Sequence, residues 1–307
     1  MRRHCSRCSN LIFRLICSNF AVMTTEQIII EIKRRLQECN DVAEANALAR
    51  MVVEEVLHYS PVDILLRGNV EQDEVLVERI RSIADRLCKG EPIQYIFGYA
   101  RFHGHEFKVT PATLIPRPET ELLVDMITDD AADTADLRVL DIGTGSGCIA
   151  ISLALALHWP EVEAFDISAE ALAVAKQNAA SLKAKVDFVL ADILTAVPEA
   201  DSLDIVVSNP PYICESERAD MERNVLEHEP ATALFVPDTD PLLFYRTIAK
   251  YAAVALKPAG RIYLEINRRF GNETCRLLEA NGFEQAQVIR DQFGNPRIVK
   301  AQLPARH

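Results

Sequence analysis

The residues Asn209-Pro210-Pro211-Tyr212 have types and spacing that could do specific chemistry. The side-chain oxygen of Asn209 and the backbone carbonyl of Pro210 are two acceptors, suited to the two N–H bonds of a planar NH2 group. Two prolines lack a backbone N–H and fix φ, so the chain must turn rigidly here. Tyr212 adds a flat ring that could pack on an amide or a base. The tetrapeptide alone is equally typical of a turn beside a core aromatic residue.

A glycine-rich segment, Gly143-Thr144-Gly145-Ser146-Gly147, offers a second candidate site. Glycines allow a sharp turn and the close approach of a ligand. The spacing is G-x-G-x-G rather than the dinucleotide fingerprint G-x-G-x-x-G, and no lysine of a phosphate-binding loop is present. A nicotinamide or nucleoside triphosphate cofactor is therefore disfavoured.

Two acidic residues follow neighbouring apolar segments. Asp166 stands where a carboxylate could accept hydrogen bonds from ribose hydroxyls, although it could equally cap a helix that begins near Ser168. Asp192, with Ile193 after it, could border an adenine ring. Ligands of open α/β sheets bind outside the carboxyl ends of the strands, and all these residues are expected on that edge.

The elements that must position these residues alternate between strand and helix after Thr120, which predicts a doubly wound α/β sheet. In the expected strand at residues 204–208, Ile205, Val206 and Val207 form a short β-branched apolar run, typical of a strand buried on both faces. The other expected strands are residues 137–142, 162–165, 186–190, 261–265, 283–290 and 297–303, and the expected helices are 148–157, 169–180 and 242–256.

Residues 24–90 repeat apolar side chains at three- and four-residue steps, which predicts a small helical bundle. Thr24 or Thr25 could cap its first helix, and Ser60-Pro61 should open another. The apolar positions are Ile28, Ile29, Ile32, Leu36, Ala45, Leu48, Met51, Val52, Val56, Val75, Val77, Ile80, Ile83 and Ala84.

A hairpin linker is expected at residues 91–113, where residues 95–98 and 102–109 alternate in polarity. His103 and His105 should be half-exposed on one strand face. They have no third ligand nearby, so we expect no metal site there.

The composition, with 307 residues of which 49% are hydrophobic, predicts a folded globular chain. A net charge of -12 argues against a surface that neutralises a phosphate backbone. Eight cysteines without regular spacing are expected to be mainly free thiols in a reducing compartment, the cytoplasm.

The first 23 residues have four arginines, three cysteines and no acidic residue. They could be a targeting segment, an overextended start before Met23, or a disordered tail. Residues 11–16 are too short an apolar run to span a membrane. Cys5, Cys8 and Cys17 lack a fourth ligand at a familiar spacing, which disfavours zinc.

The sequence resembles class I S-adenosylmethionine-dependent methyltransferases that act on a planar amide or amine nitrogen. Residues 91–96, 114–121 and 229–234 are further similar to the peptide chain release factor N5-glutamine methyltransferase family, and the resemblance covers nearly everything from Thr24 onward. The string at 115–121, Ile-Pro-Arg-Pro-Glu-Thr-Glu, is more specific than Asn-Pro-Pro-Tyr, which DNA adenine methyltransferases share. Departures from the family pattern occur at His228, Asp240-Pro241 and residues 267–269.

The resemblance implies a seven-stranded, mostly parallel Rossmann-like methyltransferase domain at residues 114–307, a hairpin linker at 91–113, and a helical substrate-docking domain at 24–90. It implies that the cofactor is held at its methionine part by Gly143, Thr144, Gly145, Ser146 and Gly147, at its ribose by Asp166, and elsewhere by Ile193 and Asn209. The implied substrate-binding residues are Asn209, Pro210, Pro211 and Tyr212, with Asn209, Pro210 and Tyr212 as the catalytic residues.

The implied activity is methylation of the side-chain N5 of the glutamine in the Gly-Gly-Gln loop of class 1 release factors, which supports translation termination. S-adenosylhomocysteine would be the second product. A monomer that uses no metal, nucleic acid or membrane is expected. Three alternatives stay open: a ribosomal-protein glutamine methyltransferase, a DNA adenine N6-methyltransferase, and a non-catalytic binding module that retains the pocket.

Overall fold

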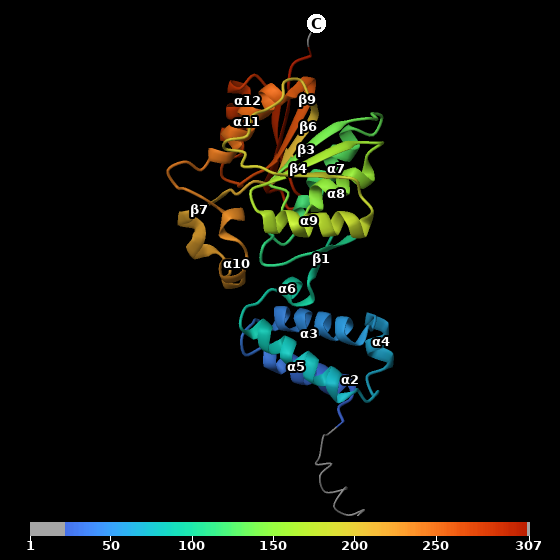
Figure 1. Ribbon diagram of the computed structural model, residues 1–307. Coiled ribbons are helices and arrows are strands. Elements are labelled where there is room, and N and C mark those ends of the chain that lie inside the picture. Colours follow the sequence, from blue (N-terminus) through green and yellow to red (C-terminus); the bar gives the residue numbers. More distant parts are fainter. Residues whose placement is uncertain (1–21, 306–307) are drawn as a thin grey trace, which may run out of the picture. The chain divides into compact units, whose positions relative to one another are not determined.

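The computed structural model describes residues 22–305 and divides at residues 96 and 97 into a helical unit and a sheet-containing unit (Figure 1). The expectations about residues 1–21, including the one that Cys5, Cys8 and Cys17 do not form a zinc site, lie outside this range. Within it, no helix is long and apolar enough to cross a membrane.

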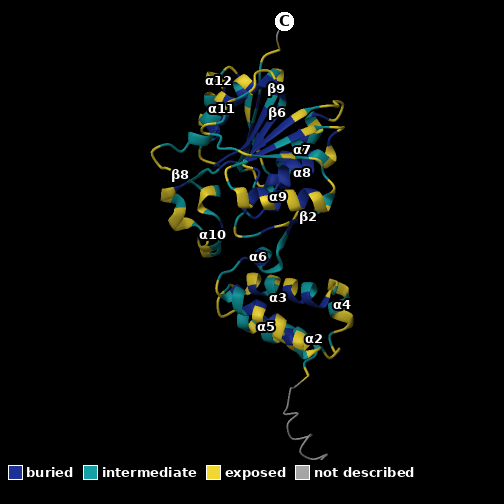
Figure 2. Cartoon of the chain, in the orientation of Figure 1, coloured by how far each residue is buried: buried dark blue, intermediate teal, exposed yellow. Residues whose placement is uncertain are grey.

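The helical unit contains α2 (Thr25–Leu36), α3 (Val42–Leu57), α4 (Pro61–Leu66) and α5 (Glu74–Cys88). The expected helix starts are confirmed: Thr24 caps α2 with Gln27, and Ser60 caps α4 with Asp63. Most of the apolar positions meet in its core (Figure 2), but Met51 and Val75 are exposed. Val75 lies two positions before the buried Val77 in the first turn of α5, which places the two side chains on opposite sides of the helix.

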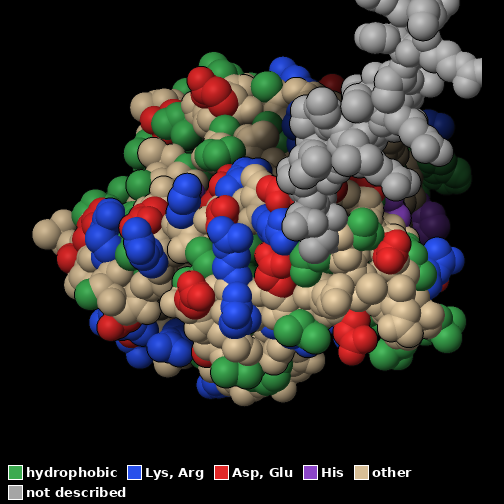
Figure 3. Space-filling view, turned by 90° about the horizontal axis from the view of Figure 1, so that it is seen from below, with side chains coloured by type: hydrophobic (Ala, Val, Ile, Leu, Met, Phe, Trp, Pro, Cys, Tyr) green, Lys and Arg blue, Asp and Glu red, His purple; other side chains and the backbone are tan. Residues whose placement is uncertain are grey.

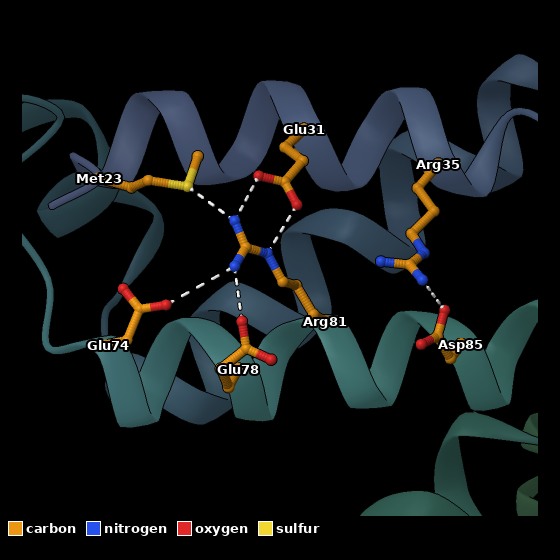
Figure 4. A network of polar contacts seen from close by, with 7 residues as sticks. All are labelled: Met23, Glu31, Arg35, Glu74, Glu78, Arg81 and Asp85. Atoms are coloured by element: carbon orange, nitrogen blue, oxygen red, sulfur yellow. Dashed lines mark hydrogen bonds and ion pairs between the residues drawn. The ribbon is translucent and has the colours of Figure 1, made fainter. Parts of the chain in front are cut away.

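The guanidinium groups of Arg81 and Arg35 each join α2 to α5 (Figure 4). Arg81, on α5, contacts both carboxylate oxygens of Glu31, on α2, at 2.8 and 3.0 Å. It also binds Glu78 at 2.6 Å and the sulfur of Met23 at 3.2 Å. The hydrogen bond from Arg81 lowers the pKa of the Glu31 carboxyl. Because this pair is bidentate and partly buried, it should stabilise more than an exposed ion pair does.

We expect Arg81→Met to lower the free energy of unfolding by about 1–2 kcal/mol, because Glu31 would lose its partner. The matched control is Arg50→Met, which removes an exposed pair between Arg50 and Glu54 within one helix and should cost about 0.5 kcal/mol. Urea denaturation followed by circular dichroism measures both. Equal losses would contradict the special role of Arg81.

Cys39 and Cys88 form a disulfide that joins the turn after α2 to the end of α5, with Cα atoms 5.5 Å apart. The expectation of free thiols is therefore wrong for this pair, while Cys148, Cys214 and Cys275 are free. The two partners lie 49 positions apart without a regular cysteine pattern, so their pairing depends on the helix packing.

The linker differs from the expected hairpin in its first half. Residues 95–97, expected in a strand, belong to a short helix, α6 (Ile93–Phe97). The hairpin pairs β1 (Tyr99–Phe102) with β2 (His105–Lys108). His103 lies in the turn with φ of 47°, so it does not share a strand face with His105, and its ring contacts Asp125 at 3.1 Å. Both histidines are half-buried.

The second unit is built on a seven-stranded sheet, which confirms the predicted fold class. Its order is β10-β11-β9-β6-β3-β4-β5; β3, β4, β5, β6 and β9 are parallel to one another, and β11 is antiparallel to both of its neighbours, β9 and β10. The strands are β3 (Arg138–Ile142), β4 (Glu161–Asp166), β5 (Asp187–Leu190), β6 (Leu203–Ser208), β9 (Leu256–Glu265), β10 (Glu284–Arg290) and β11 (Pro296–Gln302).

Helices cover both faces of the sheet (Figures 1 and 2). Ile205 and Val207 of β6 pack with α7 (Pro118–Asp130), α8 (Cys148–Ala156) and α9 (Ala169–Leu182). Val206, between them, faces α11 (Leu243–Ala255) and α12 (Gly271–Ala280). Strand residues alternate between faces, so burial on both sides explains the continuous apolar run.

The chain between β6 and α11 forms a separate excursion. Within it, β7 (Ile213–Cys214) pairs in parallel with β8 (Phe235–Val236). The segment between them contains η1 (Glu215–Asp220), α10 (Arg223–His228) and η2 (Ala231–Ala233). This excursion begins directly after Tyr212 and therefore borders the candidate site.

Candidate active site

The five parallel strands bring their carboxyl ends to one edge of the sheet. The chain runs outward through β3, β4 and β5 and then returns to β6 on the other side of β3. Ligands of doubly wound sheets bind where the strand order reverses in this way. The predicted site residues follow these strand ends: the glycine-rich segment, Asp166, Ile193 and Asn209.

The glycine-rich segment leaves β3 and enters α8. Gly143 and Gly145 have φ of 76° and 55°, and a Cβ added to either would meet nothing within 4 Å. These two residues therefore combine a left-handed backbone with open space, as a ligand cradle requires. At Gly147 a Cβ would lie 2.9 Å from Ile151 and 3.1 Å from Ala175, so this glycine serves packing.

Asp166 ends β4 and faces the glycine-rich segment. Its carboxylate accepts hydrogen bonds from the backbone N–H of Gly145 at 2.8 Å and of Ser168 at 2.9 Å. The alternative prediction, that Asp166 caps α9, is wrong, since the hydroxyl of Ser168 caps this helix by accepting a hydrogen bond from Ala171 N–H. Burial raises the pKa of Asp166, while its backbone hydrogen bonds oppose the rise. Its oxygens keep lone pairs that could accept from a diol.

Asp141 is fully buried at the end of β3, and its role was not predicted from the sequence. Its Oδ2 accepts from the Thr144 hydroxyl at 2.7 Å and from Ala150 N–H at 3.2 Å. Its Oδ1 is buried without a partner among the described residues. Burial is the main reason that the pKa of Asp141 rises to about 7. An orphan carboxylate oxygen beside a ligand cradle fits a cationic donor.

The region expected to border an adenine lies after β5. Asp192 accepts a hydrogen bond from Leu194 N–H at 2.9 Å, so this carboxylate shapes the turn. Ile193 is half-buried and packs against the core cluster on the α11 face. Ile167, next to Asp166, is 63% exposed and offers an apolar surface that was not predicted.

Asn209 and Tyr212 are connected through a buried carboxylate. The Asn209 side-chain NH2 donates to the Thr120 hydroxyl at 3.3 Å, and that hydroxyl donates to Glu265 at 2.7 Å. The Tyr212 hydroxyl donates to the other Glu265 oxygen at 3.1 Å. Pro210, which lies between Asn209 and Tyr212 in the sequence, is buried. The Asn209 oxygen is left as an acceptor at the strand end.

A second carboxylate holds the segment that leads into α7. Glu229 is buried and accepts from Ile115 N–H at 3.1 Å and from the Arg117 guanidinium at 2.5 Å. These two hydrogen bonds hold residues 115–117 against Glu229, which is distant in the sequence. They fix the segment that precedes Thr120 and so help to set the position from which the Thr120 hydroxyl reaches Asn209.

Comparisons with known proteins decide the family. The family model described as PrmC N-terminal domain matches residues 27–98, and that described as Methyltransferase small domain matches residues 118–232. The release factor glutamine methyltransferase of Bacteroides thetaiotaomicron is 45% identical over 276 residues, which cover 90% of this chain and 99% of that protein. The chain belongs to the release factor glutamine methyltransferase family.

Other members of the release factor glutamine methyltransferase family agree. The Flavobacterium psychrophilum protein is 40% identical, with 85% of this chain and 92% of that protein covered. The solved protein-(glutamine-N5) methyltransferase from Alicyclobacillus acidocaldarius is 28% identical and covers 64% of this chain and 99% of that chain, with a TM-score of 0.40. The assignment rests on the sequence relatives. They confirm the predicted family and enzyme class, an S-adenosylmethionine-dependent methyltransferase.

The site residues fit S-adenosylmethionine, the cofactor of the release factor glutamine methyltransferase family. The ribose diol matches the free lone pairs of Asp166, and the α-ammonium group matches the orphan Oδ1 of Asp141. The open space at Gly143 and Gly145 gives the cofactor access to the backbone. Asp141 belongs to the strand end that precedes the glycines, and that position is the sequence signal that could have identified it.

One departure from the family pattern contacts the site. Asn267, at one of the positions that depart from the family pattern, donates from its side chain to the Tyr212 carbonyl at 3.1 Å and to Glu217 at 2.8 Å. Asn267 ties the turn after Tyr212 to the end of β9.

We expect Asp141→Asn to lower cofactor affinity about tenfold at pH 8, because a neutral amide would replace the ammonium acceptor. The folded-state pKa is raised to about 7, so the Asp141 carboxyl makes the cofactor-free fold less stable as pH rises from about 4 to 7. The variant should lack this part of the pH dependence. Calorimetry and chemical denaturation test both effects, with the exposed Asp129→Asn as control. Unchanged affinity would contradict the role of Asp141.

Proposed function

We propose that this chain transfers the methyl group of S-adenosylmethionine to the side-chain N5 of the glutamine in the Gly-Gly-Gln loop of class 1 peptide chain release factors. The observation that supports this most is the orientation of Asn209. Its NH2 group is engaged by Thr120, so its oxygen is the end available to accept from a substrate NH2 group.

An amide nitrogen is a weak nucleophile because its lone pair is delocalised, so the site must orient it. S-adenosylmethionine, when bound, supplies an electrophilic methyl group on its sulfonium and leaves as S-adenosylhomocysteine. The Asn209 oxygen and the Pro210 carbonyl accept the two N–H bonds of the glutamine, which aims the nitrogen toward the cofactor side. The half-buried Tyr212 ring packs on the amide plane. The nitrogen then loses one proton to water as or after the new N–C bond forms.

Most of the acceleration would come from orientation and electrostatics. The Asn209 and Pro210 oxygens stabilise the positive charge that develops on the attacking nitrogen. No strong general base is needed, because the methylated nitrogen is far more acidic than the amide was. In the cofactor site, residues 143–147 and Asp166 would hold the methionine and ribose parts of S-adenosylmethionine, Ile193 would border the adenine, and Asn209 would complete the site.

The expected docking domain, residues 24–90 of the helical unit, would bind the remainder of the release factor. We expect its deletion to lower kcat/KM about tenfold more for an intact release factor than for a short peptide that contains Gly-Gly-Gln. The reason is that only the intact factor extends beyond the pocket. Steady-state assays on both substrates measure this, and an equal loss on both would contradict the docking role.

We propose that the enzyme works as a cytoplasmic monomer and does not bind nucleic acid directly. The net charge of -12 supports the last point. On the face shown in Figure 3, Lys and Arg side chains lie among Asp and Glu rather than forming a surface of one sign. A DNA substrate would instead require a surface that neutralises phosphates.

The proposed function can be tested with labelled S-adenosylmethionine and three substrates in parallel: an intact release factor, ribosomal proteins and adenine-containing DNA. Labelling of the release factor at a rate at least about a hundredfold above the other two is expected. Preferential labelling of a ribosomal protein or of DNA would replace the proposed substrate. Cofactor binding without any transfer would indicate a non-catalytic binding module.

A further inference from the structure

Glu265 is a buried carboxylate that touches two site residues without lying in the glycine-rich cradle. It ends β9 and is 1% exposed. Leu264 pairs with Ser208 across the β6–β9 register, so Glu265 lies level with Asn209 at the sheet edge. Each oxygen accepts one hydroxyl: Oε2 that of Thr120 and Oε1 that of Tyr212.

The acceptor-only chemistry of a carboxylate fixes the direction of these hydrogen bonds. The Thr120 hydroxyl has one proton, and at 2.7 Å it donates that proton to Glu265. The same oxygen can then only accept from Asn209. The NH2 end of the Asn209 amide must therefore face Thr120, and its oxygen must face the other way.

We propose that Glu265 is a positioning residue that acts through Thr120 to fix which end of the Asn209 amide meets the substrate, while its second oxygen holds Tyr212. This inference rests on the proposed use of Asn209 as an acceptor for the glutamine NH2 group. Glu265 itself touches neither substrate nor cofactor in this scheme.

The charge on Glu265 is costly, which argues against a purely structural role. Burying a carboxylate is expensive, and a neutral side chain of the same size is often as stable. Thr120 and Glu119 from α7, Tyr212 after β6 and Arg297 from β11 act on the Glu265 carboxyl. Its charge also acts on two buried groups, Cys148 at the start of α8 and Tyr245 in α11. Burial is the largest cause of the raised pKa of Glu265, Glu119 adds to it, and the two hydroxyls and Arg297 oppose it.

A glutamine at position 265 would remove the constraint on direction. The NH2 end of the new side chain can donate to the Thr120 oxygen. The Thr120 hydroxyl would then donate toward Asn209, and the Asn209 amide would rotate so that its oxygen accepts this hydrogen bond. A protonated Glu265 can donate in the same way. The kcat of the wild-type enzyme should therefore fall toward acid pH as Glu265 becomes protonated. This fall, the acidic limb of the pH profile, should be absent in Glu265→Gln.

The test compares five variants of the full chain with wild type. Glu265→Gln and Thr120→Val should each lower kcat for release factor methylation about tenfold to thirtyfold. The cofactor dissociation constant and the melting temperature should stay close to wild type. Thr120→Ser, which keeps the hydroxyl, should retain most of the wild-type kcat that Thr120→Val loses. Glu273→Gln, at an exposed position, is the charge-matched control. The double variant Glu265→Gln/Thr120→Val should be no worse than either single change, because both act on one path.

Three results would overturn the proposal: wild-type kcat in Glu265→Gln, an unchanged acidic limb in that variant, or additive losses in the double variant. A second readout does not depend on the substrate. With 15N-asparagine labelling, the side-chain NH2 signals of Asn209, assigned by their absence in Asn209→Ala, should form one sharp pair in wild type and broaden or double in Glu265→Gln. One sharp pair at the same shifts in both would also overturn it. If wild type fails to methylate release factor while the signals change as expected, the proposed function fails and the positioning role stands.

Discussion

Replacing Asn209 with alanine should lower the methyl-transfer rate about a thousandfold while the cofactor dissociation constant changes less than about twofold. The alanine removes the side-chain acceptor that orients the substrate amide and leaves the Pro210 carbonyl alone. The cofactor keeps Asp141, Asp166 and the glycine-rich segment, so its affinity should persist. Single-turnover kinetics and calorimetry separate the two quantities.

A matched control for this change is Asn281→Ala, which removes an amide that donates to the Leu277 carbonyl at the end of α12. This variant should methylate at the wild-type rate. Wild-type transfer by Asn209→Ala would show that the oriented amide at the end of β6 is not needed. A parallel loss of cofactor binding would instead place Asn209 mainly in the cofactor site.

Replacing Gly145 with alanine should weaken cofactor binding about a hundredfold. The residue has φ of 55°, and its missing Cβ faces open space. A methyl group at this position would occupy space that the bound cofactor is proposed to fill. It would also add backbone strain of about 1–2 kcal/mol. Calorimetric titration with S-adenosylmethionine measures the affinity, and thermal unfolding measures the strain.

The glycine at the β1–β2 turn provides the control. Gly104 has φ of 77° and also meets nothing within 4 Å of an added Cβ. Gly104→Ala should therefore lower the melting temperature by a similar amount but leave cofactor affinity unchanged. If both variants bind the cofactor as wild type does, the open space at Gly145 is not the cofactor cradle.

Much of the sheet could be predicted because local patterns agree with the final fold. Ile205, Val206 and Val207 are consecutive β-branched apolar residues, and β6 is buried on both faces. The first half of the linker was less predictable. Residues 95–97 contain residue types suited to strands, but Pro92 and the contacts of the short α6 place them in a helix.

The positions of Asn209 and Asp166 at strand ends could be predicted, because topology alone places them on one edge. The connections among Thr120, Glu265 and Tyr212 could not. Thr120 and Glu265 are 145 positions apart, and their hydrogen bond depends on how α7 packs beside β9. The position of Asp141 before the glycines is a signal that the sequence contains, but its burial and its unpaired oxygen are seen only in three dimensions.

Tandem mass spectrometry of an intact release factor, after reaction with this enzyme and S-adenosylmethionine, locates the transferred methyl group. We expect one added methyl group on the side-chain amide of the glutamine that follows Gly-Gly in the exposed loop. Asn209→Ala should leave that glutamine unmodified. A methyl group on any other residue, or an unmodified factor in the presence of bound cofactor, would contradict the account.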